Sequence, residues 1–460
     1  MQINLSIKNK SWQRLGLGLS ALALSAAAWA NPIFDQPDPN FTGTLGVSGV
    51  VYPGQQAEVW GRGFTPGQEV QLIRSGNVLS GTKPLVADDK GEIRAQLTIP
   101  ADAAIGLHPI VAQVAKPSAA TVFDLKVSPV VPAKGTELYV LDQAPVTNGL
   151  YQVAYSAKNN ALYVTSSVGR PPVKQSQLSQ LDPTTLKTLN AVTPTADTER
   201  EGQVMAVYGV AVDDEANTVW VTNTRADTVS VYDQKDLKLV KQFPHGSAVH
   251  ARDVVVDGTH QRAFASSPTS NQLYVFDTKT LKALEPITLN SKTRQDFSSM
   301  SLSLDPKNHK LYTVSLRTNE LAVIDTKTLR VEQVIALPGI KGAAGVSVAA
   351  DKNRVFVTGQ GSDSVGIVDV NKGELIHVVQ VGAGSLNVLW DDATQAAYVA
   401  NRGSDTLSVL DSDGNLIANL EVGSFPNHIA TDHNGHVFFV NKARGQNDDS
   451  ADFITRLQLK

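Results

Sequence analysis

The chain has 460 residues, of which 42% are hydrophobic and 18% charged; it contains no cysteine, and its formal net charge is −4. The absence of cysteine excludes disulfide bonds, thiolate chemistry and attachment through a lipidated cysteine. The weakly acidic charge argues against affinity for nucleic acid over the whole surface, but it does not exclude a local basic face.

Residues 1–30 have the features of a secretory signal peptide. Lys8, Lys10 and Arg14 precede an apolar run at residues 15–28, and Ala-Trp-Ala at residues 28–30 is a small-x-small cleavage site. The run is too short and too rich in Ala and Ser to favour a membrane anchor. We expect cleavage after Ala30, no transmembrane segment afterwards, and a periplasmic location if the cell is Gram-negative. Removing three basic residues and no acidic ones changes the formal charge from −4 to −7.

Residues 41–128 are predicted to form a small all-β sandwich. Pro-Gly and Asp-Lys-Gly turns separate short strands of alternating polarity. The motifs at residues 60–67, 88–92 and 99–102 resemble bacterial immunoglobulin-like (Ig-like) domains. The Pro-containing residues 129–135 are expected to form a stiff linker. The expected strands are Leu45–Val51, Ala57–Trp60, Glu69–Ile73, Glu92–Ile99, Pro109–Val114 and Thr121–Val127.

Residues 136–460 contain an internal repeat. A strand such as Val219–Asn223 is followed by a strand that ends in aspartate, such as Val229–Asp233. The aspartates recur at spacings of 51, 44, 48, 44 and 42 residues, which is typical of four-stranded propeller blades. They are Asp182, Asp233, Asp277, Asp325, Asp369 and Asp411.

We therefore predict an all-β fold with a seven-bladed β-propeller after the sandwich. The last repeat lacks an outer strand, and Thr136–Leu141 is a suitable donor that would close the ring and remove exposed edges. An open array or an eight-bladed ring is the alternative, because the first repeat is irregular.

The repeat resembles the YVTN family of secreted bacterial β-propellers, of which YncE-like proteins are one branch. The resemblance rests on Leu162–Thr165, Val219–Asn223, Val355–Thr358 and Tyr398–Asn401, and it extends over the propeller. It implies an extracytoplasmic binding or interaction protein without a shared catalytic motif. The sandwich is an addition to the simplest members, and the fold alone does not assign a function.

Basic residues gather in loops that we expect at one end of the propeller. The loops after the second strand and after the outer strand of each repeat open on this end, which we call the top face. Their guanidinium and ammonium groups favour binding of phosphate or carboxylate. The candidate ligand-binding residues are Arg170, Arg225, Arg252, Arg317, Arg402, Lys442 and Arg444.

Local ion pairing is the alternative for three of these arginines, since each precedes an acidic residue. The pairs would be Arg225–Asp227, Arg402–Asp405 and Arg317–Glu320. Two long loops on the top face, Ser166–Gln177 and Asn190–Val207, favour binding there, with tolerated surface variation as the alternative. The asparagines that end second strands are expected to hold turns; they are Asn223, Asn401 and Asn441.

No catalytic motif and no cofactor site is predicted. There is no Gly-x-Ser-x-Gly elbow and no phosphate-binding Gly-rich loop. The repeat pattern places His428 at the opposite end of the propeller from His433 and His436, so these residues are not expected to share a metal ion. Three aromatic residues are expected to pack between sheets rather than stack on bases: Phe264, Trp390 and Phe425.

The leading functional hypothesis is a monomeric, periplasmic, non-catalytic binding protein that uses the basic top face. Its ligand would be anionic: a nucleic acid strand, a carboxylate-rich small molecule or an acidic protein surface. One alternative is a lactonase-like metal-dependent hydrolase or lyase with a cation in the central channel, near Asp253, Asn387 and Asn427. Another is a cell-envelope scaffold whose sandwich docks to a partner.

Overall fold

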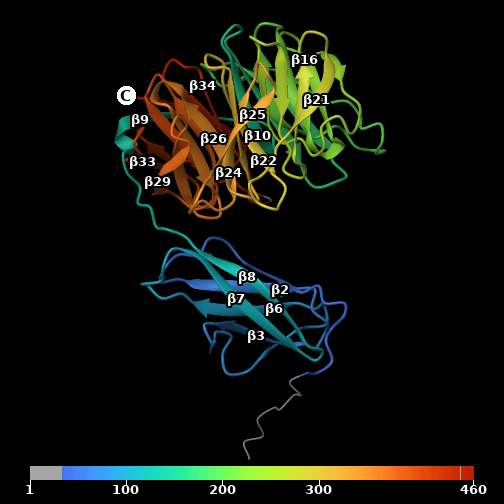
Figure 1. Cartoon of the computed structure of the whole chain (residues 1–460), viewed down its shortest axis with the longest axis vertical. Coiled ribbons are helices and arrows are strands. Elements are labelled where there is room, and N and C mark those ends of the chain that lie inside the picture. Colours follow the sequence, from blue (N-terminus) through green and yellow to red (C-terminus); the bar gives the residue numbers. More distant parts are fainter. Residues whose placement is uncertain (1–33, 446) are drawn as a thin grey trace, which may run out of the picture.

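The computed structural model describes residues 34–445 and 447–460, and nearly all of their regular structure is β-strand. The signal peptide expected at residues 1–30 lies outside the described residues. Figure 1 shows a smaller N-terminal body joined by one connection to a larger body built of many sheets. Within residues 34–445 and 447–460, no helix is long and apolar enough to cross a membrane.

The N-terminal body consists of two antiparallel sheets. One contains β1 (Thr44–Val47), β2 (Gln56–Arg62) and β6 (Ile93–Thr98). The other contains β3 (Glu69–Arg74), β4 (Asn77–Val78), β5 (Leu85–Val86), β7 (Gly106–Ala115) and β8 (Ala119–Val127).

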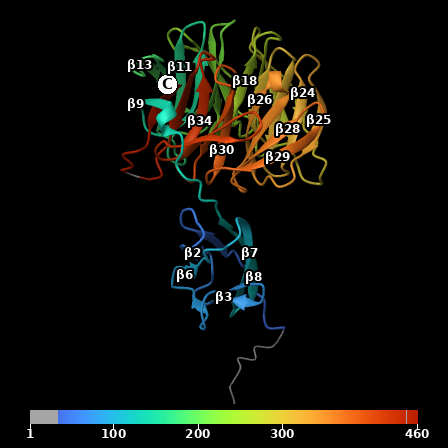
Figure 2. The same ribbon diagram turned by 90° about the vertical axis from the view of Figure 1, so that its left-hand side faces the viewer.

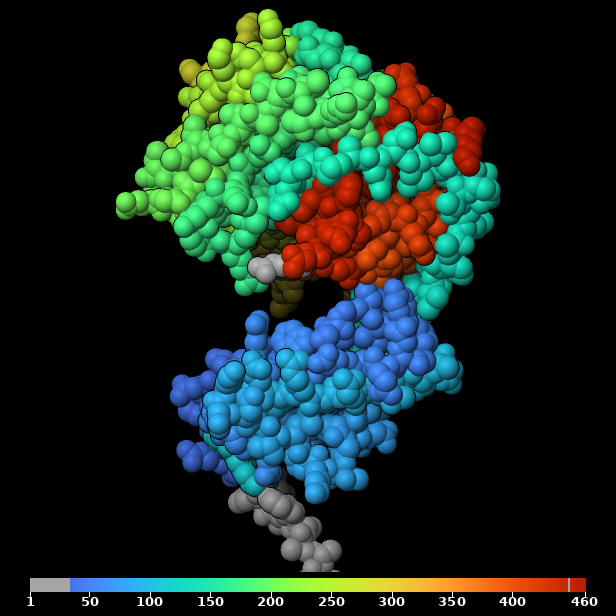
Figure 3. Space-filling view, turned by 180° about the vertical axis from the view of Figure 1, so that it is seen from behind, coloured from blue at the N-terminus to red at the C-terminus, as the bar shows by residue number. Residues whose placement is uncertain are grey.

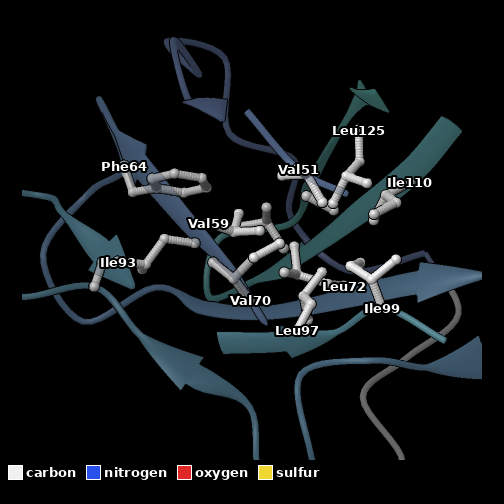
Figure 4. Close-up of a cluster of buried hydrophobic side chains, with 14 of the residues drawn as sticks. Val51, Val59, Phe64, Val70, Leu72, Ile93, Leu97, Ile99, Ile110 and Leu125 are labelled. Carbon is white, nitrogen blue, oxygen red and sulfur yellow. The ribbon is translucent and has the colours of Figure 1, made fainter. Parts of the chain in front are cut away.

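Alternation of buried and exposed residues along these strands produces the core between the sheets. Val59 on β2, Leu72 on β3 and Ile110 on β7 are all less than 3% exposed. Figure 4 shows these side chains converging, with Phe64 at one end of the cluster. The apolar face of each sheet is thereby removed from water, which is the main source of stability for such a body.

The larger body is propeller-like, and each of its sheets has four antiparallel strands. The first strands of successive sheets contact one another in chain order around a central channel, and β10 also contacts β34. Figure 2 shows the sheets from the side. The strands of the first four sheets are β10 (Leu150–Ser156), β11 (Ala161–Val168), β12 (Gln175–Leu181), β13 (Thr188–Val192); β14 (Val207–Asp213), β15 (Thr218–Asn223), β16 (Thr228–Asp233), β17 (Leu239–Gln242); β18 (Val254–Asp257), β19 (Arg262–Ala265), β20 (Gln272–Asp277), β21 (Lys282–Thr288); β22 (Ser299–Asp305), β23 (Lys310–Ser315), β24 (Glu320–Asp325) and β25 (Arg330–Ala336).

The remaining sheets follow the same order from the channel outward, except that the last takes its outer strand from another part of the chain. Their strands are β26 (Ala343–Ala349), β27 (Arg354–Gly359), β28 (Ser364–Asp369), β29 (Glu374–Gln380); β30 (Ser385–Asp391), β31 (Ala396–Asn401), β32 (Thr406–Leu410), β33 (Leu416–Glu421); and β34 (Pro426–Thr431), β35 (His436–Asn441), β36 (Phe453–Leu459) and β9 (Tyr139–Pro145). Short 3₁₀ helices are η1 (Thr136–Leu138), η2 (Thr224–Ala226) and η3 (Ala350–Lys352).

Strand β9 pairs with β36 from Tyr139↔Leu459 to Pro145↔Phe453, as the donor-strand prediction requires. The donor begins later than Thr136–Leu141, because Gly135 adopts a left-handed conformation and η1 follows it. Before η1, the backbone of Lys134 exchanges hydrogen bonds with Asn419 on β33. The connection therefore lies against the outside of the propeller.

The repeated aspartates form turns. The Oδ1 atom of Asp233 accepts hydrogen bonds from the backbone N–H groups of Lys235 and Asp236, and Asp369 does the same for Asn371 and Lys372. This is the side-chain-to-backbone turn that aspartate forms readily. The repeat that defines the fold is therefore a turn signal and belongs to the structure rather than to the site.

The prediction of a long loop at Ser166–Gln177 is wrong. β11 continues to Val168 and β12 begins at Gln175, with Ser167 paired to Ser176. The pairing partner determines this extension, because the local sequence has weak strand propensity. The second expected loop, Asn190–Val207, is shorter than predicted because β13 continues to Val192, and an isolated bridge joins Ala196 to Val204 inside it.

Candidate anion-binding site

The top ends of the inner strands form an uneven ring around the channel mouth. The second residue of β10 is Tyr151, that of β14 is Tyr208, and Arg252 lies just before β18. The second residues of the next inner strands are apolar and buried, as for Met300 and Leu386. One arc of the mouth is therefore aromatic and cationic, and the opposite arc is apolar.

Five of the predicted basic residues gather at the aromatic and cationic arc of the channel mouth, and we call them the cationic cluster. They come from four loops, because Lys442 and Arg444 share the loop between β35 and β36. The cluster consists of Arg225, Arg252, Arg402, Lys442 and Arg444.

Aromatic rings hold the cations of this cluster in place. Lys442 Nζ lies 3.4 Å from the centroid of the Tyr151 ring, and the rings of Tyr151 and Tyr208 are 4.0 Å apart between centroids. The partly buried ring of Phe425 contacts two guanidinium groups, with centroid distances of 4.6 Å to Arg402 and 4.4 Å to Arg444. Cation–π contact of this kind orients a positive group without neutralising it.

Burial and mutual repulsion change the acidity of these groups. Burial and, to a smaller extent, the positive charges of Arg402 and Arg225 lower the pKa of Lys442 to about 8, while the charge of Asp452 opposes the shift. Burial also lowers the pKa of Arg252 and of Arg402, and the charge of Arg252 acts in the same direction on Arg402. Both arginines remain charged at neutral pH, because the ordinary pKa of a guanidinium is so high.

The carboxylates next in sequence to Arg225 and Arg402 do not pair with them, and only Arg444 of the cluster has a carboxylate partner. Asp227 accepts a hydrogen bond from the backbone N–H of His250 (2.7 Å), and Asp405 forms an ion pair with Arg444 (2.5 Å). Among the described residues, no ion pair within 4.0 Å joins a carboxylate to the side chain of Arg225, Arg252, Arg402 or Lys442. The local pairing that the sequence left open is therefore absent for Arg225 and Arg402.

Buried donor groups remain unused in the cluster. The Nε atoms of Arg225, Arg252 and Arg402 are buried and have no hydrogen-bond partner in the described part of the chain. The backbone of Arg225 is fixed by Arg200, whose side chain donates a hydrogen bond to its carbonyl oxygen. The second predicted loop thus supports the site through Arg200.

The two other predicted residues lie apart from the cluster. Arg170 lies between β11 and β12 and Arg317 between β23 and β24, and both are exposed. Glu320, the expected partner of Arg317, is buried and accepts hydrogen bonds from the backbone of Lys292 and from Thr318. These two arginines are top-face residues without a connection to the channel mouth.

Below the cluster, a polar belt crosses the channel. Asp253 accepts hydrogen bonds from the side chain of Gln152 (3.1 Å) and from the backbone N–H of Leu302 (2.9 Å). His428 Nδ1 accepts a hydrogen bond from the backbone N–H of Val153 (3.4 Å). Burial lowers the pKa of His428 to about 4, so this ring is neutral at pH 7. A cavity of about 320 Å³ lies in the channel below the belt.

The polar residues of the belt are engaged in holding neighbouring sheets together. Asn427 donates to the carbonyl oxygen of Tyr151 (2.6 Å), and Asn387 donates to that of Asn427 (3.4 Å). Of Asn387, Asn427 and Asp253, only Asp253 could give a cation a carboxylate ligand. Both oxygens of that carboxylate already accept hydrogen bonds from protein groups. Among residues 34–445 and 447–460, no group of three His, Asp or Glu side chains could hold a metal ion.

The asparagines that end second strands have structural roles, but only Asn441 bonds to backbone groups as predicted, whereas Asn223 and Asn401 bond to side chains. Asn223 donates to Ser230 (2.6 Å) and Asn401 donates to Ser408 (2.8 Å) on the neighbouring strand. Asn441 accepts a hydrogen bond from the backbone N–H of Phe453 (2.8 Å). They are buried and not available to a ligand.

Sequence reasoning missed the aromatic part of the site. Phe425 was expected to pack between sheets, but it stacks on two arginines at the surface, whereas Phe264 and Trp390 are buried as predicted. Tyr151 and Tyr208 were not singled out. Their shared position in β10 and β14 is a signal that comparison of the repeats at this position would have found.

The N-terminal body contacts the same face of the propeller. Lys126 on β8 forms an ion pair with Asp363 (2.6 Å) and donates to the carbonyl oxygen of Gln360 (2.9 Å), in the loop between β27 and β28. Burial and the charges of Asp363 and Asp405 raise the pKa of Tyr52, while Arg444 lowers it. Figure 3 shows an open gap between the two bodies on one side of the molecule.

Comparisons with known proteins agree with the propeller. No family model matches the chain. YncE from Salmonella typhi is 26% identical over 330 residues, which cover 68% of this chain and 89% of that protein. YncE from Escherichia coli (strain K12) is 24% identical over 257 residues, which cover 54% and 69% of the two chains. The propeller is YncE-like. These relatives are themselves uncharacterised.

Solved structures with much lower identity share the fold. Virginiamycin B lyase from Staphylococcus aureus has a TM-score of 0.55 at 15% identity, covering 70% of this chain and 100% of that chain. The WD40 repeats of RRP9 have a TM-score of 0.57 at 9% identity, covering 72% and 99%. Because one neighbour is a lyase and another consists of WD40 repeats, the likeness shows the fold alone.

Proposed function

We propose that the chain is an extracytoplasmic, non-catalytic binding protein whose cationic cluster binds an anionic ligand at the channel mouth. The observation that carries this proposal is the concentration of positive charge around Lys442. Among the described residues, Arg225, Arg252, Arg402 and Lys442 form no ion pair with a carboxylate within 4.0 Å, and only Arg444 of the cluster is paired, with Asp405. Like charges repel, so such a group is costly unless a counter-charge arrives. A phosphate- or carboxylate-bearing ligand supplies that charge and occupies the free guanidinium donors.

The proposal includes the finer architecture. We infer a seven-bladed ring closed by β9, an Ig-like sandwich at residues 41–128, a linker at residues 129–135 and a propeller at residues 136–460. We also infer removal of residues 1–30, a periplasmic location and a monomeric state. The closed cyclic contacts of the inner strands support the ring, and the apolar run before Ala30 supports export.

Three ligand classes were considered from the sequence: a nucleic acid strand, a carboxylate-rich small molecule and an acidic protein surface. The cluster is compact and lies at a channel mouth, which favours a small polyanion over an extended surface. The metal-dependent hydrolase or lyase has less support, because the oxygens of Asp253 already accept hydrogen bonds from protein groups. The scaffold hypothesis predicts loss of a co-purifying partner when residues 31–128 are deleted.

Salt dependence tests the proposal. Tripolyphosphate and citrate are titrated into the mature chain by calorimetry at low and high ionic strength, with a single-stranded oligonucleotide as a third probe. We expect saturable binding of at least one small polyanion that weakens as salt increases, because exposed charges are screened. Absence of binding by both small anions, or binding that is indifferent to salt, contradicts the proposal. If only the oligonucleotide binds, the proposal of a small polyanion is wrong and the ligand is a nucleic acid.

A further inference from the structure

A second pocket lies between the two sheets of the N-terminal body, at the end opposite Phe64. It has a volume of about 350 Å³, within the range of small-molecule sites. Leu97 and Ile99 form one wall, and Ile110 and Leu125 form the other. Figure 4 shows these four side chains at the end of the core away from Phe64 and Ile93. The walls are apolar and each of these residues is at most 8% exposed.

Two polar side chains occupy core-facing positions at the mouth of this pocket. On β3, buried Val70 and Leu72 alternate with more exposed residues, so Arg74 lies on the core face at the strand end. On β7, His108 is in register with buried Ile110. Both residues line the pocket. A sandwich that merely closes its core would place apolar residues at these positions.

Arg74 retains free donors toward the pocket. Its Nη1 atom donates to the carbonyl oxygen of Pro109 (3.1 Å), which fixes one side of the guanidinium group. Among the described residues, Arg74 forms no ion pair with a carboxylate within 4.0 Å. His108 Nε2 lies 2.7 Å from the carbonyl oxygen of Ala104, which holds the ring at the mouth. The site therefore combines a partly open apolar volume with one cation at its entrance.

We propose that this pocket binds a single alkyl chain with an anionic head group, as in a free fatty acid. The alkyl chain of the ligand lies between Leu97, Ile110 and Leu125, and the carboxylate of the ligand pairs with Arg74. Burial of methylene groups supplies the affinity, and the guanidinium group selects the head group. The site is separate from the cationic cluster and does not depend on the function proposed for it.

The test compares three probes of equal chain length below their micellar concentrations: decanoate, decanol and decyltrimethylammonium. Binding to the mature chain is measured by calorimetry. We expect the tightest binding for decanoate and the weakest for the cation. Arg74→Gln is expected to weaken decanoate binding about tenfold while leaving decanol unchanged, since only the charge-assisted contact is lost.

Two variants locate the binding. Ala103→Trp fills the pocket entrance and is expected to abolish decanoate binding, whereas Ala101→Trp, at an exposed position in the same turn, leaves it intact. Changing Arg225, Arg402 and Lys442 together to Gln is expected to leave decanoate binding intact. The proposal is overturned if the native chain shows no saturable decanoate binding, if the cationic probe binds equally well, or if a folded Ala103→Trp variant still binds.

Discussion

Lys442 lies against the ring of Tyr151 and near the guanidinium groups of Arg225 and Arg402. Its pKa of about 8 is well below the ordinary lysine value of 10.5, so the ammonium loses its proton more readily than an exposed lysine. The folded-state pKa lies below the unfolded-state value, so the fold gains stability as pH rises from about 8 toward 10.5. Anion binding has the opposite dependence, because it requires the charged form.

We predict that affinity for a small polyanion falls about tenfold as pH rises through about 8, the pKa of Lys442. Titrations with tripolyphosphate between neutral and alkaline pH measure this change. In Lys442→Arg the positive charge persists, and the fall should disappear. A fall of the same size in that variant contradicts the assignment to Lys442.

His428 is a residue-scale test of the polar belt. Its pKa of about 4 lies below the ordinary value of 6.5, so the unfolded chain takes up a proton before the folded chain does. Stability is therefore lost as pH falls from 6.5 toward 4, by about 3 kcal/mol. Denaturant unfolding of His428→Gln should show less acid sensitivity. An unchanged pH profile, or an equal effect of exposed His377→Gln, contradicts the prediction.

Single residues were only partly predictable. The basic residues stand out because they interrupt the repeats, but nothing local distinguishes Arg402, which stacks on Phe425, from exposed Arg317. The difference arises when neighbouring sheets bring their loops together. Tyr151 and Tyr208 lie in ordinary alternating strand patterns, so nothing local singled them out.

At the scale of elements, the pairing of β9 with β36 joins residues near the two ends of the described propeller. The strands were predictable, because alternation and turn-forming aspartates are local signals. The lengths of β11 and β12 were not, because their extension depends on mutual pairing. The ends of a strand therefore depend on the strand it pairs with, and the local sequence does not determine them.

Leu457 on β36 tests this closure. It is 1% exposed and packs in a cluster with Tyr139 of β9 and Tyr398 of β31. Leu457→Ala should lower the free energy of unfolding by about 2–5 kcal/mol, since it removes buried methyl groups and leaves a cavity. Leu459→Ala in the same strand, 50% exposed, should change it by less than about 0.5 kcal/mol. Equal effects in denaturant titrations contradict the closure.

At the scale of the whole molecule, the N-terminal body stands against the face that carries the cationic cluster. The contact between Lys126 and Asp363 joins residues that are 237 positions apart, and no motif marks either one. Propeller and sandwich were therefore predictable separately, from repeats and turns, whereas their mutual placement was not. Asp363 also accepts a hydrogen bond from the backbone N–H of Gly384 (2.6 Å), so it belongs to the propeller framework.

Lys126→Gln should loosen the contact between the two bodies. The side chain of Asp363 is 1% exposed, so loss of its charged partner is unfavourable in the closed arrangement. Small-angle scattering should report a larger radius of gyration, while circular dichroism should be unchanged. Lys90→Gln, at an exposed turn, is the control. An unaltered scattering curve for Lys126→Gln would show that this ion pair does not hold the bodies together.

The most direct test of the account is a comparison of two variants with matched loss of top-face charge. In one, Arg225 and Arg402 of the cluster are changed to Gln; in the other, the exposed Arg170 and Arg317 are changed to Gln. The dissociation constant for tripolyphosphate is measured by calorimetry at a fixed salt concentration. We predict a loss of at least about 30-fold for the cluster variant and less than about threefold for the control. Equal losses in the two variants would contradict a site at the channel mouth.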